Sequence, residues 1–197
     1  MLCPKDRKTP LIDTCLTEGL NTKHCTDCKG TWLPAAEYKV WQKRQPEGEL
    51  DPARLSAPLD VEFVQAPYDT RAALCPECGA YLARARVNWR PAFYVERCPA
   101  CEGIWCDHGE WAVLEKLGFH RSIHTLFSKD WQVRVRKQQL IDQERQAIIE
   151  KLGPELAEKI FILTAELEEH PKGDFGVAYL MRRFENVRND ASASDPY

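Results

Sequence analysis

The chain has 197 residues, of which 44% are hydrophobic and 29% are charged, and its formal net charge is only −3. This length allows one medium domain or two small ones, and the small net charge excludes a basic surface over the whole chain of the kind that binds nucleic acid. The N-terminus lacks the apolar core of a secretory signal, and no stretch approaches the roughly 20 apolar residues that span a bilayer. These features favour a cytoplasmic protein, in which nine reduced cysteines are better explained by metal than by disulfides.

Residues 1–45 are predicted to form a first small module. Residues 11–16 and 20–24 are two short strand candidates on either side of a turn that contains Gly19, which is the pattern of a β-hairpin. Cysteines stand at both ends of this hairpin.

Residues 46–71 form a proline-rich and mostly acidic segment. Proline favours extended backbone and interrupts helices, so we expect an extended linker with one short strand at residues 61–65. Such a linker can keep two modules apart or dock them against each other, and its composition favours neither arrangement.

Residues 72–118 are predicted to form a second module of the same kind. Residues 81–87 alternate apolar and basic side chains, and residues 92–97 are another strand candidate after a turn at residues 88–91. A second hairpin is therefore expected here.

Helix signals complete both modules. Asp107 and Glu110 have the spacing of a capping box, and Gly118 stands where the helix would stop. Pro34 occupies the equivalent start in the first module and suits the first turn of a helix.

An internal repeat relates the two modules. Cys3 aligns with Cys75, and Cys28 aligns with Cys101, with one residue of slack between the paired cysteines. Each last cysteine is followed by a glycine and a tryptophan, namely Gly30 and Trp32 in the first copy and Gly103 and Trp105 in the second. Glycine at such a place indicates a positive φ or a close approach of the backbone, and the tryptophans are expected to cover the ribbon. Two copies are too few for a solenoid, so we expect two similar modules in series.

The cysteine spacing of the second module is typical of a structural zinc site, with Cys75, Cys78, Cys98 and Cys101 as its candidate ligands. A C-x-x-C turn places two sulfurs on one edge of a tetrahedron, and a second C-x-x-C across a hairpin supplies the opposite edge. A module this small has little apolar core, and zinc contributes about 10–16 kcal/mol to the folding of comparable peptides. The spacing therefore predicts a closed four-sulfur Zn²⁺ site.

The first module carries a less regular set of candidate ligands, namely Cys3, Asp6, Cys25 and Cys28. Asp6 stands where Cys78 stands in the second copy, and a carboxylate is a legitimate zinc ligand. Cys15 and His24 are its rivals. The repeat places Cys15 at an apolar mid-strand position, which indicates a small core residue, and His24 directly precedes a ligand and is expected to point to the other side of its strand. We therefore predict a second Zn²⁺ ion with Asp6 as the fourth ligand.

The remaining cysteine and histidines lack the spacing of metal ligands. Cys106 follows Trp105 directly and is expected to pack in the core. Four histidines are interpreted as surface or capping residues, namely His108, His120, His124 and His170.

Residues 119–188 contain no cysteine and are predicted to be helical. Apolar residues recur at helical spacing over residues 131–152, Gly153 and Pro154 interrupt the pattern, and a second stripe runs over residues 156–167. A third helix is expected to start near Asp174. The small and polar residues 189–197 are predicted to form a disordered tail.

The run from Cys98 to Glu110, in which C-P-x-C-x-G-I-W is followed by D-x-G-E, resembles the bacterial zinc-ribbon family named for its similarity to transcription factor IIB. Residues 75–117 fit this pattern closely, and residues 1–41 resemble a diverged second copy with Asp6 as the main departure. The resemblance implies zinc binding and a ribbon fold, and it implies little about a substrate.

These observations predict an α+β, metal-stabilised fold in which small zinc-ribbon β-hairpin modules are followed by C-terminal α-helices. We expect a non-enzymatic adaptor, with a role related to transcription, that contacts a protein partner or, weakly, nucleic acid. A basic face on the second hairpin is the candidate for nucleic acid, formed by Arg84, Arg86, Arg90 and Arg97. The alternatives are a metal-handling or thiol redox-sensing protein and a zinc-dependent hydrolase that uses the first site, although no general base or phosphate loop accompanies that site.

Overall fold

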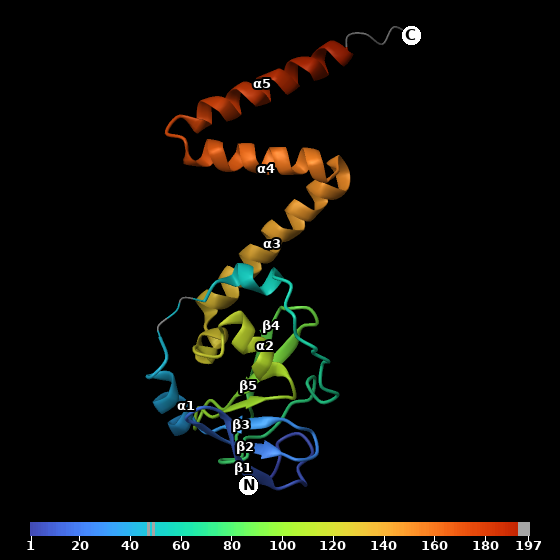
Figure 1. Ribbon diagram of the computed structural model, residues 1–197. Helices are drawn as coiled ribbons and strands as arrows, with labels where there is room; N and C mark the ends of the chain where they lie inside the picture. Colours follow the sequence, from blue (N-terminus) through green and yellow to red (C-terminus); the bar gives the residue numbers. More distant parts are fainter. Residues whose placement is uncertain (47, 49, 193–197) are drawn as a thin grey trace. The chain divides into compact units, whose positions relative to one another are not determined.

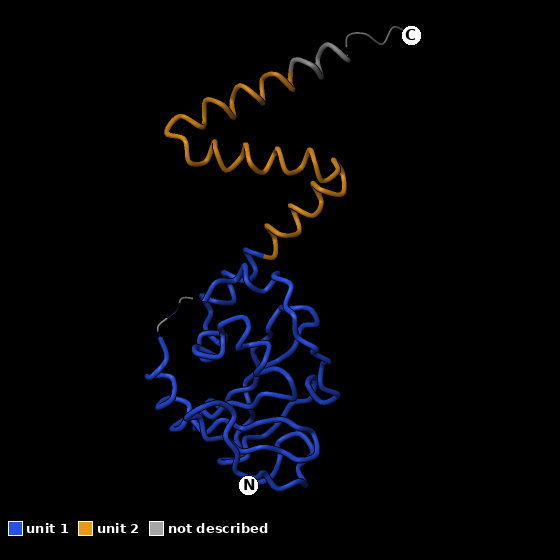
Figure 2. Tube along the Cα trace, viewed as in Figure 1, with its two compact units in different colours: residues 1–138 blue, residues 139–197 orange. Residues whose placement is uncertain are grey.

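The computed structural model describes residues 1–46, 48 and 50–192, with side chains up to residue 185 (Figure 1). The chain divides into two compact units, residues 1–138 and residues 139–197 (Figure 2). The first unit holds both cysteine-bearing modules, and the second unit is helical. The predicted class, a metal-stabilised α+β fold, is confirmed by this arrangement together with the cysteine clusters.

The first unit is built on one antiparallel sheet with the strand order β1-β2-β3-β6-β5-β4. Its strands are β1 (Leu11–Thr17), β2 (Leu20–Cys25), β3 (Thr31–Leu33), β4 (Ala83–Val87), β5 (Phe93–Arg97) and β6 (Ile104–Cys106). The hairpins β1–β2 and β4–β5 were expected from alternation and turn residues, but β3 and β6 were not predicted. These two short strands directly follow the cysteine turns and carry too few residues to show a period.

The strands β3 and β6 join the two modules into one sheet. Trp32 in β3 lies opposite Trp105 in β6, with Leu33 opposite Ile104 on one side of this pair. All six residues of the two strands are buried. The modules therefore share a continuous backbone hydrogen-bond network rather than standing independently in series.

The tryptophan of each module packs against a glycine of the other module. A Cβ atom placed on Gly103 would lie 2.1 Å from Cζ2 of Trp32, and one placed on Gly30 would lie 2.2 Å from Cζ2 of Trp105. Neither glycine has a positive φ. These glycines are therefore explained by close approach and not by a positive φ, because each indole ring occupies the space that a side chain would need.

Two short helices of the first unit meet through aromatic side chains. They are α1 (Ala35–Gln42), which follows Pro34, and α2 (Glu110–Leu117), which ends at Gly118 with φ of 77° as predicted. Trp41 of α1 meets Trp111 of α2 at 5.7 Å between ring centroids, and His120 lies at 5.7 Å from the first ring and 5.6 Å from the second. His120, predicted to be a surface or capping residue, is not on the surface, because this aromatic cluster buries it. Its amide donates to the carbonyl of Leu114 in the last turn of α2, at 3.2 Å.

The linker docks on the second module. It contains one turn of 3₁₀-helix, η1 (Pro52–Ser56), capped by Asp51. Residues 61–65 form no strand, which corrects the prediction. Phe63 instead packs against Trp89 and Phe93, at 5.9 and 5.2 Å between ring centroids. Phe63 is half-buried, and together with Leu59 and Val61 it anchors this segment to the core without a regular backbone ladder.

The helices beyond the ribbons match the sequence pattern. After η2 (Ile123–Phe127), α3 (Lys129–Leu152) runs across the boundary between the units and is followed by α4 (Pro154–Glu169) and α5 (Gly173–Ser192). Gly153, with φ of 78°, and Pro154 at the first helical position separate α3 from α4. The predicted disordered tail was wrong for residues 189–192, which belong to α5, and residues 193–197 lie outside the described part. None of the described helices combines the length and the apolar composition of a membrane span.

Candidate metal centres

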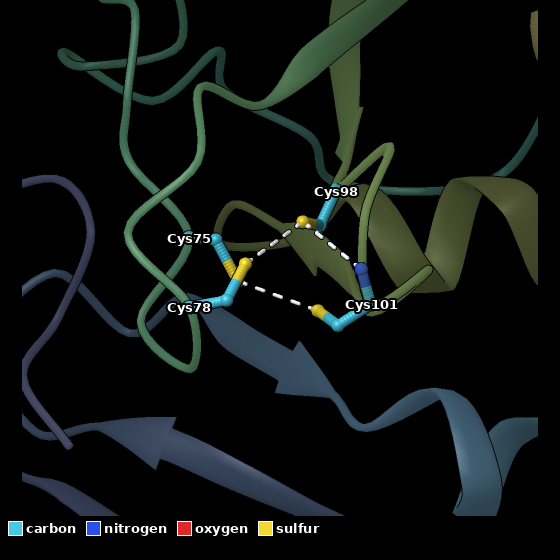
Figure 3. Close-up of side chains that lie close together, drawn as sticks. All are labelled: Cys75, Cys78, Cys98 and Cys101. Atoms are coloured by element: carbon cyan, nitrogen blue, oxygen red, sulfur yellow. Dashed lines mark hydrogen bonds between the residues drawn. The ribbon is translucent and has the colours of Figure 1, made fainter.

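Four sulfurs converge between the two cysteine turns of the second module (Figure 3). The Sγ atoms of Cys75 and Cys101 are 3.4 Å apart, as are those of Cys78 and Cys98. All four lie within 4.8 Å of one another. This spacing is that of the edges of a sulfur tetrahedron, so the predicted set is brought together and is consistent with zinc binding.

The backbone of these turns stabilises thiolates. The amide of Cys101 donates to Sγ of Cys98, and the amide of Glu77 donates to Sγ of Cys75, both at 3.4 Å. Burial alone would raise the pKa of Cys98, but the amides of Cys101 and Ala100 and the neighbouring thiols lower it to about 7. A thiolate is the form that binds metal, and the turn favours this form at Cys98, whereas burial raises the pKa values of Cys75 and Cys101.

Three of the four predicted ligands of the first module also converge. Cys3, Cys25 and Cys28 place their sulfurs within 4.8 Å of one another, and the Sγ atoms of Cys3 and Cys28 are 3.6 Å apart. The hydrogen bond from Cys28 lowers the pKa of Cys3 to about 6. This second cluster is likewise consistent with zinc binding.

Asp6 lies at the edge of the first cluster. Its Oδ1 accepts hydrogen bonds from the amides of Lys8 and Thr9, at 2.8 and 3.0 Å, which hold the carboxylate in place. Its Oδ2 lies 3.9 Å from Sγ of Cys25. Arg7, the next residue, has a φ of 60°, as Gly79 does after Cys78 in the second module, with a φ of 76°. Asp6 is outside the group whose ligand atoms all lie within 4.8 Å of one another, and it has one oxygen fixed by the turn and the other facing a sulfur.

The two rivals of Asp6 point elsewhere. Cys15 is exposed on the edge strand β1, and its thiol donates to the carbonyl of Thr17 at 2.9 Å. The prediction that Cys15 is a core residue was wrong, because β1 has no layer packed over this position. Nδ1 of His24 lies 3.5 Å from Oγ1 of Thr31 and the ring is outside the sulfur cluster, as predicted. Cys106, also predicted to pack in the core, is buried.

The two tryptophans lie beside the cysteine clusters, and Trp32 is hydrogen-bonded to the cysteine turn of the opposite module. The indole of Trp32 donates to Oε1 of Glu77, which stands between Cys75 and Cys78, at 3.0 Å. The indole of Trp105 donates to Oδ1 of Asp107 at 2.7 Å. Both rings are fully buried beside the cysteines, so they cover the centres as expected, but Trp32 does so across the module boundary.

The proposed basic face on the second hairpin is reduced by intramolecular contacts. The guanidinium of Arg84 donates to the carbonyls of Asp69 and Thr70 and lies 4.0 Å from the ring centroid of Tyr94. Arg97 lies over Phe127. Only Arg86 and Arg90 of the four arginines are exposed.

A buried ionic network next to the first centre was not predicted. Nζ of Lys5 lies 2.5 Å from Oε1 of Glu96 and 3.2 Å from Oδ2 of Asp107, with all three side chains buried. The capping box was half correct, since Glu110 accepts from the amide of Asp107 at 2.7 Å, whereas the side chain of Asp107 turns to Trp105 and Lys5. Nothing in the sequence pairs Lys5 with Glu96, because the contact depends on the joining of the modules.

The sheet and the two cysteine clusters define a metal-stabilised α+β protein with zinc-ribbon architecture. Residues 74–117 match the family model described as the transcription factor zinc-finger, the ribbon of the TFIIB type. This match covers the second module, and the cluster of Cys3, Cys25 and Cys28 lies outside it. No curated protein and no solved structure matches the chain.

Proposed function

We propose that the protein is a non-enzymatic adaptor that holds two Zn²⁺ ions, one in each module, and binds a protein partner through its C-terminal helices. The family match and the four sulfurs of the second module support zinc at that centre. Four sulfurs complete a tetrahedron and leave no position for water or substrate, which is the arrangement of structural zinc rather than of catalytic zinc.

Zinc content tests the two-site part of this proposal. Elemental analysis of the purified chain should give two zinc ions per chain. Mild chelation should remove the ion of the first module before that of the second, because a carboxylate replaces one sulfur there. A chain that carries one tightly bound ion and leaves Cys3, Cys25 and Cys28 open to alkylation contradicts it.

The observation that carries the adaptor function is the apolar surface of the second unit. Large apolar side chains are exposed on α4 and α5, namely Leu156, Ile162, Leu163, Phe175, Val177, Tyr179, Met181 and Phe184. The exposed fraction reaches 71% for Phe175 and 68% for Phe184. Packing between α4 and α5 therefore does not consume the apolar stripes, and surfaces of this kind mark sites of protein contact.

A capture experiment with the full chain tests this function. The affinity of the double variant Phe175→Asp/Phe184→Asp for the partner should be at least about tenfold lower than that of wild type. The reason is that each aromatic anchor contributes about 1–2 kcal/mol or more to an interface. Glu185→Gln, on the same helix, serves as the polar control. Partner binding should also resist moderate salt, because apolar contact is not screened. A partner retained by the double variant contradicts the proposal.

A second candidate, contact with single-stranded nucleic acid, is favoured by a hollow beside the first cysteine turn. The hollow has a volume of about 820 Å³, and its lining includes the buried Lys5, the carboxylates of Asp6 and Asp27, and the rings of Tyr68 and Tyr81. Three exposed cations also line it, namely Arg7, Lys8 and Arg71. These cations have no carboxylate within ion-pair distance among the described residues. Cations interleaved with aromatic rings suit a flexible strand, and binding lost in Arg7→Ala/Arg71→Ala but kept in Arg86→Ala/Arg90→Ala would support this candidate.

A further inference from the structure

Three buried carboxylates meet inside the first unit, and one of them, Asp107, also pairs with Lys5. Asp69 comes from the linker, and Asp107 and Glu110 come from the turn into α2. Each offers an oxygen within 4.8 Å of the other two. Their exposed fractions are 0%, 4% and 1%, so this is a desolvated cluster and not a solvated acidic surface.

Neighbouring cations balance only part of the negative charge. Glu96, also fully buried, adds a fourth carboxylate, which Lys5 links to Asp107. Lys5 pairs with Glu96 and Asp107, and Nε of Arg84 lies 3.8 Å from Oε1 of Glu96. Neither Asp69 nor Glu110 has a basic side chain within 4 Å among the described residues. With all four carboxylates ionised, two cations leave an excess of two negative charges, which a protein interior does not tolerate without compensation, and burial accordingly raises the pKa of Glu96 to about 8.

Two buried carboxylate oxygens of this cluster lack a hydrogen-bond partner. Glu110 uses Oε2 to accept the amide of Asp107, but its Oε1 is buried without a hydrogen-bond partner. Oδ2 of Asp107 also lacks a hydrogen bond and has only the ion pair with Lys5 at 3.2 Å. Buried acceptors that lack a donor are rare in native proteins and call for an ion, a water or a proton.

We propose that Asp69, Asp107 and Glu110 hold one divalent, oxygen-seeking cation of the class of Ca²⁺, Mg²⁺ or Mn²⁺. A charge of +2 equals the excess, and an all-carboxylate donor set selects this class over the thiolate-seeking metals of the cysteine clusters. The cation would fasten the linker, through Asp69, to the start of α2. The proposal does not depend on the adaptor function, because it concerns the inside of the first unit.

Protonation is the rival explanation. A shared proton would also neutralise Glu110, and burial among like charges raises the pKa of Glu110 well above its ordinary value. The two explanations differ in what Glu110→Gln does. If a cation is bound, the variant removes a ligand and the cation is lost, whereas if a proton is bound, an uncharged side chain of the same shape is tolerated.

The experiment uses the full chain with its cysteine-bound metal retained. Elemental analysis after gel filtration without chelator should find one equivalent of Ca²⁺, Mg²⁺ or Mn²⁺ in addition to zinc. For protein depleted of that ion by extensive dialysis, adding about 5 mM of the retained cation should raise Tm by about 5 °C. Glu110→Gln and Asp69→Asn should lose the extra equivalent and the rise in Tm but keep their zinc. Glu115→Gln, an exposed substitution in α2, should behave as wild type.

Wild-type protein decides the matter if the variants fail to fold. A wild-type chain that retains none of the three cations, and whose Tm none of them raises, overturns the proposal. The same holds if Glu110→Gln retains the extra cation. If Glu110→Gln is as stable as wild type in every cation, the carboxylates share protons instead.

Discussion

Replacing Gly103 by alanine tests the interlocked tryptophans, the least expected feature of the fold. The new Cβ would lie 2.1 Å from Cζ2 of Trp32, and 2.7 and 2.8 Å from two further atoms of the same ring. Ordinary carbon contacts begin at about 3.5 Å, so the ring or the strand must move by more than 1 Å. Trp32 is fully buried and hydrogen-bonded to Glu77, so it has no free space to move into.

The expected loss of stability follows from these contacts. Overpacking a closed core costs about 1–3 kcal/mol, and breaking the Trp32–Glu77 hydrogen bond adds about 1 kcal/mol. A total near 3 kcal/mol should lower the Tm of this unit by about 10 °C. Gly30→Ala, which would meet Trp105 at 2.2 Å, should have a similar effect.

The assay is thermal unfolding followed by circular dichroism, together with release of zinc to a coloured chelator. Gly48→Ala is the matched control, because nothing lies within 4 Å of a Cβ at that position. Because Trp32 belongs to the first module and touches the turn of the second, Gly103→Ala should speed metal loss from both centres. In a double-mutant cycle, Trp32→Leu should relieve part of the clash, so the two substitutions should cost less together than the sum of each alone. A Tm for Gly103→Ala within about 2 °C of that of Gly48→Ala would refute the reasoning.

The remaining predictions concern single side chains. Asp6→Ala should loosen zinc in the first module only, and Asp6→Cys should tighten it, as measured by competition with a chelator; equal affinities in all three proteins would exclude Asp6 as a ligand. Cys15→Ala should change the free energy of unfolding by less than about 0.5 kcal/mol and leave the zinc content at the wild-type value, because the side chain is exposed; loss of zinc would show that the ligand was misassigned. Without added divalent cation, the raised pKa of Glu110 means that the folded state binds a proton more tightly than the unfolded state. The wild-type protein should therefore become less stable as the pH rises above 4.5, the ordinary pKa of this group. The Tm of Glu110→Gln should therefore rise relative to that of wild type between pH 5 and pH 8, on the order of several degrees. A difference in Tm that stays constant over this range would contradict a raised pKa for Glu110.

The cysteine clusters were largely predictable from the sequence. A C-x-x-C turn is local, because the backbone amides that favour the thiolate lie within three residues of the sulfur, as Cys101 does for Cys98. The helices α3 and α4 were also predictable from the sequence, because they carry apolar residues at helical spacing and Gly153 and Pro154 separate them. Local spacing and local hydrogen bonds were sufficient in both cases.

The joining of the modules was decided only by tertiary structure. β3 and β6 have three residues each, too short for any periodicity, and their pairing depends on Trp32 and Trp105 fitting over glycines about 70 residues away in the chain. The exposure of Cys15 and the burial of His120 follow from the same event, because sheet order leaves β1 at an edge and brings α1 against the residues after α2. The pattern of a single sequence predicts which residues form apolar surfaces. It does not predict which of these surfaces pack together, because that depends on long-range contacts.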